Sequence, residues 1–150
     1  SHEDASEARE LRGRSWRVKF RYKKLGPGVL RPIIPIAVEY EGRVLMYEVL
    51  VDSGADICIF DAEIGEALGL DVASGARQDV AGLTGVSEPY FMHEVTLRVG
   101  GRPHRARVGF MSSMGRHGHG IVGQLGFFDR YIVKFDYEKE EVELKERVGG

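Results

Sequence analysis

The sequence predicts a mostly β protein in which the strands form a closed or sandwiched structure. Three observations support this fold class. Glycine occurs 20 times in 150 residues, about twice its average usage, which is typical of a chain with many tight turns. Short stretches of alternating apolar and polar residues recur along the chain. The sequence shows neither a long helical period nor a regular alternation of strands with helices.

The first strand is expected at residues 16–22, where apolar and basic residues alternate as on a strand with one solvated face. Residues 1–14 are polar without an apolar period, so we expect a flexible leader or tag remnant before a single domain at residues 15–147. Basic residues dominate residues 9–24, and acidic residues dominate residues 136–146. These opposite charges predict that the two ends pair, within one chain or between two.

The remaining elements follow from the same kinds of pattern. Two strands joined by a tight turn are expected at residues 33–40 and 44–52. The second is almost uniformly apolar from Val44 to Val51, which predicts burial on both faces. Asp61 is expected to cap a short helix that runs to Leu68. Further strands are expected at residues 92–99, 104–110, 131–137 and 142–144, and a second short helix at residues 124–130.

Composition argues against several classes of protein. A formal net charge of −2 is far from that of a strongly basic nucleic-acid-binding protein, and the basic residues of 16–22 fit a half-buried strand better than a nucleic-acid patch. The single cysteine, Cys58, excludes an intramolecular disulfide. No apolar run approaches the roughly 20 residues of a membrane helix. Because no signal-peptide pattern is visible, we expect a cytoplasmic protein.

The triplet Asp52-Ser53-Gly54 is the strongest candidate site. The triplet alone is a weak motif, because roughly one chain in ten to twenty of this length contains one by chance. Its position is more informative, since Asp52 directly follows the apolar stretch at residues 49–51. A carboxylate in such a place is costly unless it is paired, hydrogen-bonded or functional. Gly54 allows the backbone to approach closely and donate its N–H to the carboxylate.

Three segments in this order resemble the retropepsin-like aspartic proteases. They are residues 51–56, the glycine-flanked turn at residues 82–85 and the apolar-apolar-Gly triplet at residues 121–123. Residues 123–137 are also similar to the C-terminal part of the bacterial and archaeal single-domain members. The resemblance covers about residues 32–145 and implies a retropepsin-like closed β-barrel, a single lobe of the acid-protease fold, with one or two short helices.

The resemblance also implies roles for individual residues. Asp52 takes the place of the catalytic aspartate, Ser53 that of the hydroxyl bracing the two active-site loops, and Gly54 that of a backbone contact to substrate. Ala55 and Asp56 are implied to line the substrate cleft. Further substrate contacts, at the tip of a flap and in the central specificity pocket, are implied for Gly82, Leu83, Thr84, Gly85 and Ile121.

Peptide hydrolysis of this kind needs two carboxylates that share one proton around a water molecule. The chain contains one Asp-Ser/Thr-Gly triplet, whereas a two-lobed enzyme needs two in a chain about twice as long. The resemblance therefore implies a homodimer with one Asp52 per subunit, acting on peptide or protein substrates without a cofactor. The alternative is a retropepsin-fold dimerisation or peptide-binding module with little or no proteolytic activity.

Four further features of the sequence bear on the ion pairs and on other possible sites. Family members often carry Arg where this chain has Gln124, so the usual ion pair with Asp56 is replaced by a neutral hydrogen bond at most. His117 and His119 invite a metal site, but no Cys or acid lies close in sequence and we expect no metal. Cys58 lies in an apolar run, which favours a buried residue over a nucleophile. Residues 82–85 lack the Lys and the following helix of a phosphate-binding loop.

Overall fold

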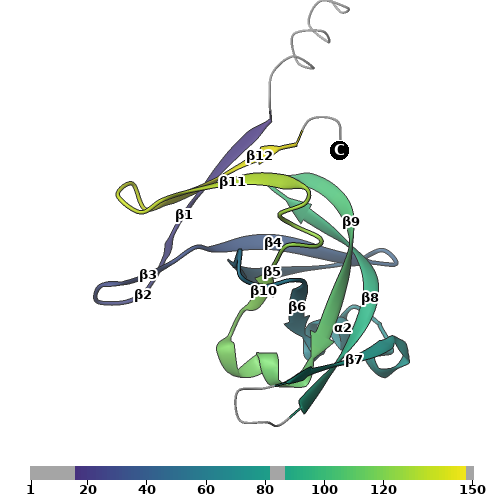
Figure 1. Cartoon of the computed structure of the whole chain (residues 1–150). Helices are drawn as coiled ribbons and strands as arrows, with labels where there is room; N and C mark the ends of the chain where they lie inside the picture. The colour runs from purple at the N-terminus through teal and green to yellow at the C-terminus, as the bar shows by residue number, and fades with distance from the viewer. Residues whose placement is uncertain (1–15, 82–86, 148–150) are drawn as a thin grey trace, which may run out of the picture.

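A computed structural model describes residues 16–81 and 87–147 of the chain (Figure 1). The strands are β1 Arg17–Arg21, β2 Lys23–Gly26, β3 Val29–Arg31, β4 Ile33–Tyr40, β5 Arg43–Val51, β6 Cys58–Asp61, β7 Ala76–Ala81, β8 Ser87–Val99, β9 Arg102–Met111, β10 Gly120–Val122, β11 Tyr131–Asp136 and β12 Glu141–Glu146. The helical segments are α2 Ala62–Ala67 and the 3₁₀ turns η1 Val72–Ser74 and η2 Ser112–His117. None of the described helices is long and apolar enough to span a membrane.

A closed barrel forms the body of the molecule. Its strands follow one another in the order β4-β5-β10-β6-β9-β8, and β8 pairs back onto β4 to close the ring. Strand β7 pairs with the free edge of the long strand β8 and extends away from the barrel (Figure 1). This topology confirms the mostly β, closed-barrel fold class expected from the sequence.

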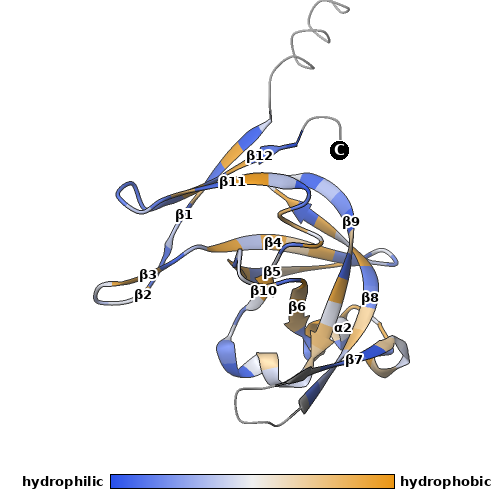
Figure 2. Ribbon diagram, viewed as in Figure 1, coloured by the Kyte–Doolittle hydropathy of each residue, from blue (hydrophilic) through white to orange (hydrophobic). Residues whose placement is uncertain are grey.

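The core lies inside the barrel and continues towards the terminal strands. Its largest fully buried side chains are Phe60, Phe110, Phe127 and Tyr131. Hydropathy follows this arrangement, with hydrophobic residues along β5 and β6 where these strands enclose the core (Figure 2). Alternate residues of each barrel strand face inwards, which is why the alternating sequence pattern predicts most of the strands.

A separate three-stranded sheet, in the order β1-β12-β11, holds the two ends of the described chain together. The pairing predicted from the opposite charges therefore occurs within one chain, with β1 antiparallel to β12. Lys19 Nζ lies 3.9 Å from a Glu143 carboxylate oxygen and 4.0 Å from one of Glu141. Exposed pairs of this kind contribute little energy. The buried side chains of Val142 and Leu144 fix the sheet against the core instead.

Two local predictions are wrong. The first half of β5 is not buried on both faces, since the side chains of Val44 and Met46 are 53% and 68% exposed. The reason is that β10 pairs only with residues 49–51 of β5, which leaves the preceding residues with β4 as their single neighbour among the described strands. Residues 124–130 form successive turns rather than a helix, because Gly126 adopts a φ of +100° that no helix accommodates.

The predicted short helix α2 is confirmed. Asp61 lies in an extended conformation at the N-cap, and its Oδ1 accepts a 3.0 Å hydrogen bond from the backbone N–H of Glu63. Gly69 follows the C-cap with a φ of +91°, a conformation that favours glycine.

Candidate active site

Asp52 lies at the end of β5, in a tight turn that fixes its carboxylate. The backbone N–H of Gly54 donates a 2.9 Å hydrogen bond to Asp52 Oδ1. The backbone N–H of Asp52 donates to the carbonyl of Val122 over 3.0 Å, and its carbonyl accepts from Ala55 over 3.2 Å. The Asp52 side chain is half-buried, whereas Ser53, Gly54 and Asp56 are exposed. The chain therefore holds one oriented carboxylate at an open surface.

Strand β10 brings a second segment of the chain next to Asp52. Strands β5 and β10 run parallel, with Val51 opposite Val122, so the residues following both strands meet at the same end of the sheet. Gly123 fits between two loop segments so closely that a Cβ there would lie 2.5 Å from the carbonyl oxygens of both Ala55 and Ile57. A residue with a side chain cannot take this position without displacing the Asp52 loop.

Gln124 ties the two loops together. Its backbone N–H donates to the carbonyl of Ala55 over 2.8 Å, and its side-chain Nε2 donates to the carbonyl of Ser53 over 2.7 Å. The neutral side chain of Gln124 therefore bonds to the backbone of the loop that carries Asp52. The sequence allowed a hydrogen bond to the carboxylate of Asp56, and the side chain does not make that bond. Asp56 contributes its own carbonyl, which accepts from Leu125 N–H over 3.0 Å.

A row of side chains crosses four strands and reaches Ile121. Ile121 on β10 lies opposite Ile59 on β6, Ile59 opposite Gly109 on β9, and Gly109 opposite Met92 on β8. Residues opposite one another in neighbouring strands point to the same face of the sheet. Ile121, Ile59 and Met92 are only partly buried, whereas their neighbours Val122, Cys58 and Phe60 face the core, so this row lies on the outer face of the barrel.

Gly109 is the position in this row over which neighbouring side chains pack directly. A Cβ at Gly109 would lie 2.6 Å from Tyr90 Cδ2, 2.8 Å from Ile59 Cδ1 and 3.3 Å from Met92 Sδ. Sequence reasoning missed Ile59, Tyr90, Met92 and Gly109, although a glycine inside a strand is a signal of close approach. Recognising the row needs the register of four strands, which the sequence pattern does not supply.

The implied flap residues Gly82, Leu83, Thr84 and Gly85 lie outside the described residues. Strands β7 and β8 on either side of them are antiparallel, with Ala76 opposite Met92. Beside the base of β8, Ser113 in η2 donates a hydrogen bond to the carboxylate of Glu88. A cavity of about 340 Å³ lies at this contact, and its lining includes Phe91, Met111 and Arg116.

In the described part of the chain no three His, Cys, Asp or Glu side chains group together as ligands for a metal ion. The rings of His117 and His119 lie 6.2 Å apart. His104 is buried in the core, where burial lowers its pKa below the usual 6.5. Its Nε2 donates to the carbonyl of Gly126 over 2.8 Å, and its Nδ1 accepts from the Tyr131 hydroxyl over 3.0 Å.

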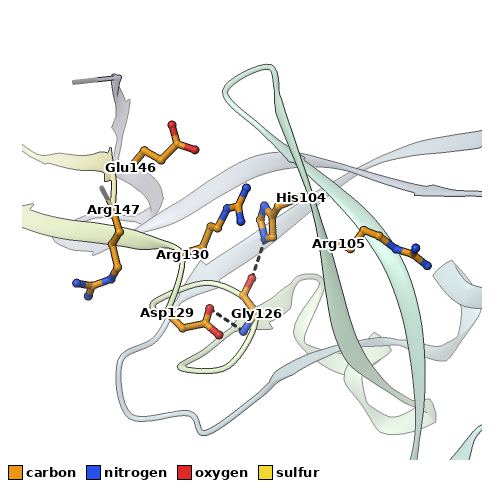
Figure 3. Close-up of a pocket in the computed structure, with 7 residues that line it drawn as sticks. All are labelled: His104, Arg105, Gly126, Asp129, Arg130, Glu146 and Arg147. Atoms are coloured by element: carbon orange, nitrogen blue, oxygen red, sulfur yellow. Dashed lines mark hydrogen bonds between the residues drawn. The ribbon is translucent and has the colours of Figure 1, made fainter. Parts of the chain in front are cut away.

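His104 and Gly126 border a cavity of about 180 Å³ on the side of β9 that faces the terminal sheet. Figure 3 shows Arg130 extending towards His104, whereas Arg105 and Arg147 point away from it. None of the residues implied for catalysis lines this cavity.

Cys58 is fully buried, as expected. Burial raises the pKa of its thiol to about 11, and its Sγ lies 3.4 Å from the carbonyl of Leu125, to which it donates. Because the thiol is buried and its pKa is raised, Cys58 contributes to core packing and does not act as a nucleophile.

Comparison with known proteins agrees with this architecture. A family model described as aspartyl protease matches residues 36–126, which include the whole Asp52 loop, β10 and Gln124. No curated protein matches the chain.

Two solved structures are similar to the chain. A retropepsin-like aspartic protease from Rickettsia conorii has a TM-score of 0.61 at 14% sequence identity, over 89% of this chain and 94% of that chain. EIAV protease in complex with the inhibitor HBY-793 has a TM-score of 0.47 at 21% identity, over 63% of this chain and 82% of that chain. Since the family match spans more than half of the sequence and the Rickettsia fold agrees along most of it, the chain belongs to the aspartyl protease family and its fold is retropepsin-like.

Proposed function

We propose that the protein is an aspartic endopeptidase that hydrolyses peptide bonds as a homodimer, with one Asp52 carboxylate from each subunit. The observation that carries this proposal is the hydrogen bond from Gly54 N–H to Asp52 Oδ1 at the end of β5. It orients a carboxylate at an open surface of a chain that contains one such triplet. Two copies related by a two-fold axis supply the second carboxylate.

The two Asp52 carboxylates share one proton and hold a water molecule between them. The ionised Asp52 takes a proton from this water as its oxygen attacks the carbonyl carbon of the peptide bond. The protonated Asp52 of the other subunit donates its proton to the carbonyl oxygen, which gives a tetrahedral diol. Return of a proton to the peptide nitrogen then allows the C–N bond to break, and a carboxylic acid and an amine leave.

The outer-face row supports an extended peptide as the substrate. Ile121, Ile59 and Met92 offer apolar contacts that lead away from the Asp52 end of β5, and Gly109 lets the side chains of Ile59 and Tyr90 pack close to the backbone between them. Ala55 and Asp56 follow Gly54 on the same loop, where we expect them to line the substrate cleft. Ser53 is exposed in the single chain, which fits a hydroxyl that contacts the other subunit.

The alternative is a dimerisation or peptide-binding module with the same fold. It is favoured by one observation, the bond from Gln124 to Ser53, which replaces the ion pair expected beside Asp56. In this alternative the loop stays ordered and the cleft still binds peptides, but no bond is cleaved.

A peptide-library cleavage assay at acidic and near-neutral pH tests the proposal. Asp52→Asn is expected to lower the cleavage rate on the order of 10³-fold, the contribution of a positioned acid–base group. Asp71→Asn is the matched control, because Asp71 is exposed and its side chain caps no helix. Cleavage that persists in Asp52→Asn would exclude this mechanism, and peptide binding without cleavage by the wild type would establish the module.

A further inference from the structure

The β2–β3 hairpin stands apart from the other two sheets of the described chain. It forms a two-stranded sheet of its own, closed by a two-residue turn at Pro27 and Gly28. Leu25 and Val29 are 51% and 36% exposed on it. A two-stranded hairpin on its own is marginally stable in water. Exposed apolar side chains on such a hairpin favour contact with another protein surface over contact with solvent. Its ion pair from Lys23 Nζ to Glu48 Oε1, at 2.6 Å, is itself exposed.

The base of this hairpin lies directly beside the candidate active site. Pro32 follows β3, and its carbonyl accepts a 2.9 Å hydrogen bond from the N–H of Val51, the residue before Asp52. Ile33 lies opposite Leu50 in the β4–β5 ladder. The C-terminal end of the hairpin is therefore hydrogen-bonded to Val51, the residue that precedes Asp52.

The other end of the hairpin is fixed to the terminal sheet. Tyr22 precedes β2 and donates its N–H to the carbonyl of Glu140 over 2.8 Å, in the turn between β11 and β12. Burial and the negative charge of Asp136 raise the pKa of the Tyr22 hydroxyl. Figure 1 shows that the β2–β3 hairpin and the β11–β12 hairpin extend to the same side of the molecule. Phe135 and Tyr137 are exposed at the second of these hairpins.

We propose that the β2–β3 hairpin is a dimer arm, which packs Leu25 and Val29 against a second copy of this chain. The inference rests on the proposed function, because that function brings two Asp52 side chains together. A second copy that places its Asp52 beside the first one's comes close to the base of the hairpin, since Pro32 is hydrogen-bonded to the residue that precedes Asp52. In a two-fold dimer both arms make the same contact.

Charge supports the same occupant. The hairpin carries Lys23, Lys24 and Arg31 and no acid. Lys24 and Arg31 are exposed and form no ion pair with any other described residue. The surface that a second copy brings towards the axis carries the exposed Asp56 beside Asp52. A basic arm against an acidic loop favours association of two identical chains and steers their encounter.

Analytical ultracentrifugation of the full chain tests the arm. The double variant Leu25→Asp/Val29→Asp is expected to raise the dimer dissociation constant about tenfold or more, because two charges replace apolar contacts at the interface. Val44→Asp/Met46→Asp is the matched control. It introduces the same two charges at exposed apolar positions near the opposite end of β5, so its dissociation constant is expected to stay within about twofold of wild type.

Hydrogen exchange of the wild-type chain gives a second measurement that needs no variant. Amides of the β2–β3 hairpin are expected to gain protection as the protein concentration rises through the dissociation constant, whereas amides at the β4–β5 turn are not. An unchanged dissociation constant in the arm variant, or hairpin exchange independent of concentration, would overturn the arm. A dimer that responds to the arm variant yet cleaves no peptide would keep the arm and remove the proposed function.

Discussion

Gly123 is the residue at which the two loops of the candidate site press most closely on each other. Its Cα faces the carbonyl oxygens of Ala55 and Ile57, and the carbonyl of Ala55 already accepts a hydrogen bond from the N–H of Gln124. Gly123→Ala is therefore expected to lower the free energy of unfolding by about 1–3 kcal/mol, because the added methyl group has no space and the surrounding atoms cannot rotate away. Urea unfolding followed by circular dichroism measures this change.

Gly26→Ala serves as the control for that variant. Gly26 has no atom within 4 Å of the position of a Cβ and no left-handed φ, so alanine is expected to change the free energy of unfolding by no more than about 0.5 kcal/mol. Equal effects of the two substitutions would contradict the close packing at Gly123.

His104 makes the stability of the fold depend on pH. Burial lowers the pKa of His104, so the folded chain keeps the imidazole neutral at pH values at which the unfolded chain protonates it. The contribution of neutral His104 to stability is therefore complete above about pH 6.5 and is lost as the pH falls towards the folded-state pKa, at up to about 1.4 kcal/mol per pH unit. Protonation would also place a proton on Nδ1, where the Tyr131 hydroxyl now donates.

The measurement is the free energy of unfolding between about pH 5 and pH 7.5. His104→Gln is expected to flatten this profile, whereas His117→Gln, at an exposed position, is expected to keep the wild-type slope. A His104→Gln profile as steep as that of the wild type would show that another group is responsible.

At the scale of elements, the cap of α2 offers a comparison between two aspartates that precede helical turns. Asp61 accepts a hydrogen bond from Glu63 N–H at the N-cap of α2, whereas the side chain of Asp71 makes no cap bond at η1. Asp61→Ala is expected to lower the free energy of unfolding by about 1 kcal/mol, the usual value of such a cap. Asp71→Ala is the control, and thermal or urea unfolding that ranks Asp71→Ala as the more damaging change would contradict the assignment.

Elements with their own local pattern could be predicted from the sequence, and elements defined by distant neighbours could not. The cap at Asp61 and the alternation in β1 depend on adjacent residues, and the structure agrees with them. In β11 the alternation holds only as far as Lys134, because Phe135 is exposed. The exposure of Val44 and Met46 depends on how far β10 extends along β5, which no local pattern encodes. The sequence predicts a helix at residues 124–130, whereas the structure has turns there. The sequence pattern does not reveal that Gly126 adopts a left-handed φ.

The same division holds in the candidate site. Asp52 could be found because a carboxylate directly after an apolar strand conflicts with burial, and Gly123 because it ends an apolar triplet. Ile59, Met92 and Gly109 are brought together only by strand register across the barrel. Ile59 and Met92 are unremarkable in their own segments, and Gly109 inside a strand indicates a close approach without identifying the side chains involved. The roles of the residues at 82–85 remain predictions, since they lie outside the described residues.

At the scale of the whole molecule, the proposed sharing of one active site between two chains has a statistical consequence. When wild type and Asp52→Asn are mixed in equal amounts and allowed to exchange subunits, about a quarter of the dimers contain two intact carboxylates. Peptidase activity per wild-type chain is therefore expected to fall to about half. A mixture that keeps the full activity of its wild-type component would show that each chain acts alone. A mixture with Asp71→Asn in place of Asp52→Asn is the control.

The terminal sheet has one further consequence. Because β1, β12 and β11 pair within a single chain and bury Val142 and Leu144 against its own core, this sheet is complete within residues 16–81 and 87–147 without a strand from another subunit. If the proposed homodimer forms the active site, folding and activation are two separate equilibria, the first independent of concentration and the second governed by it. Dilution of the protein is then expected to abolish peptidase activity while each chain stays folded, so that chain concentration rather than unfolding sets when the site exists.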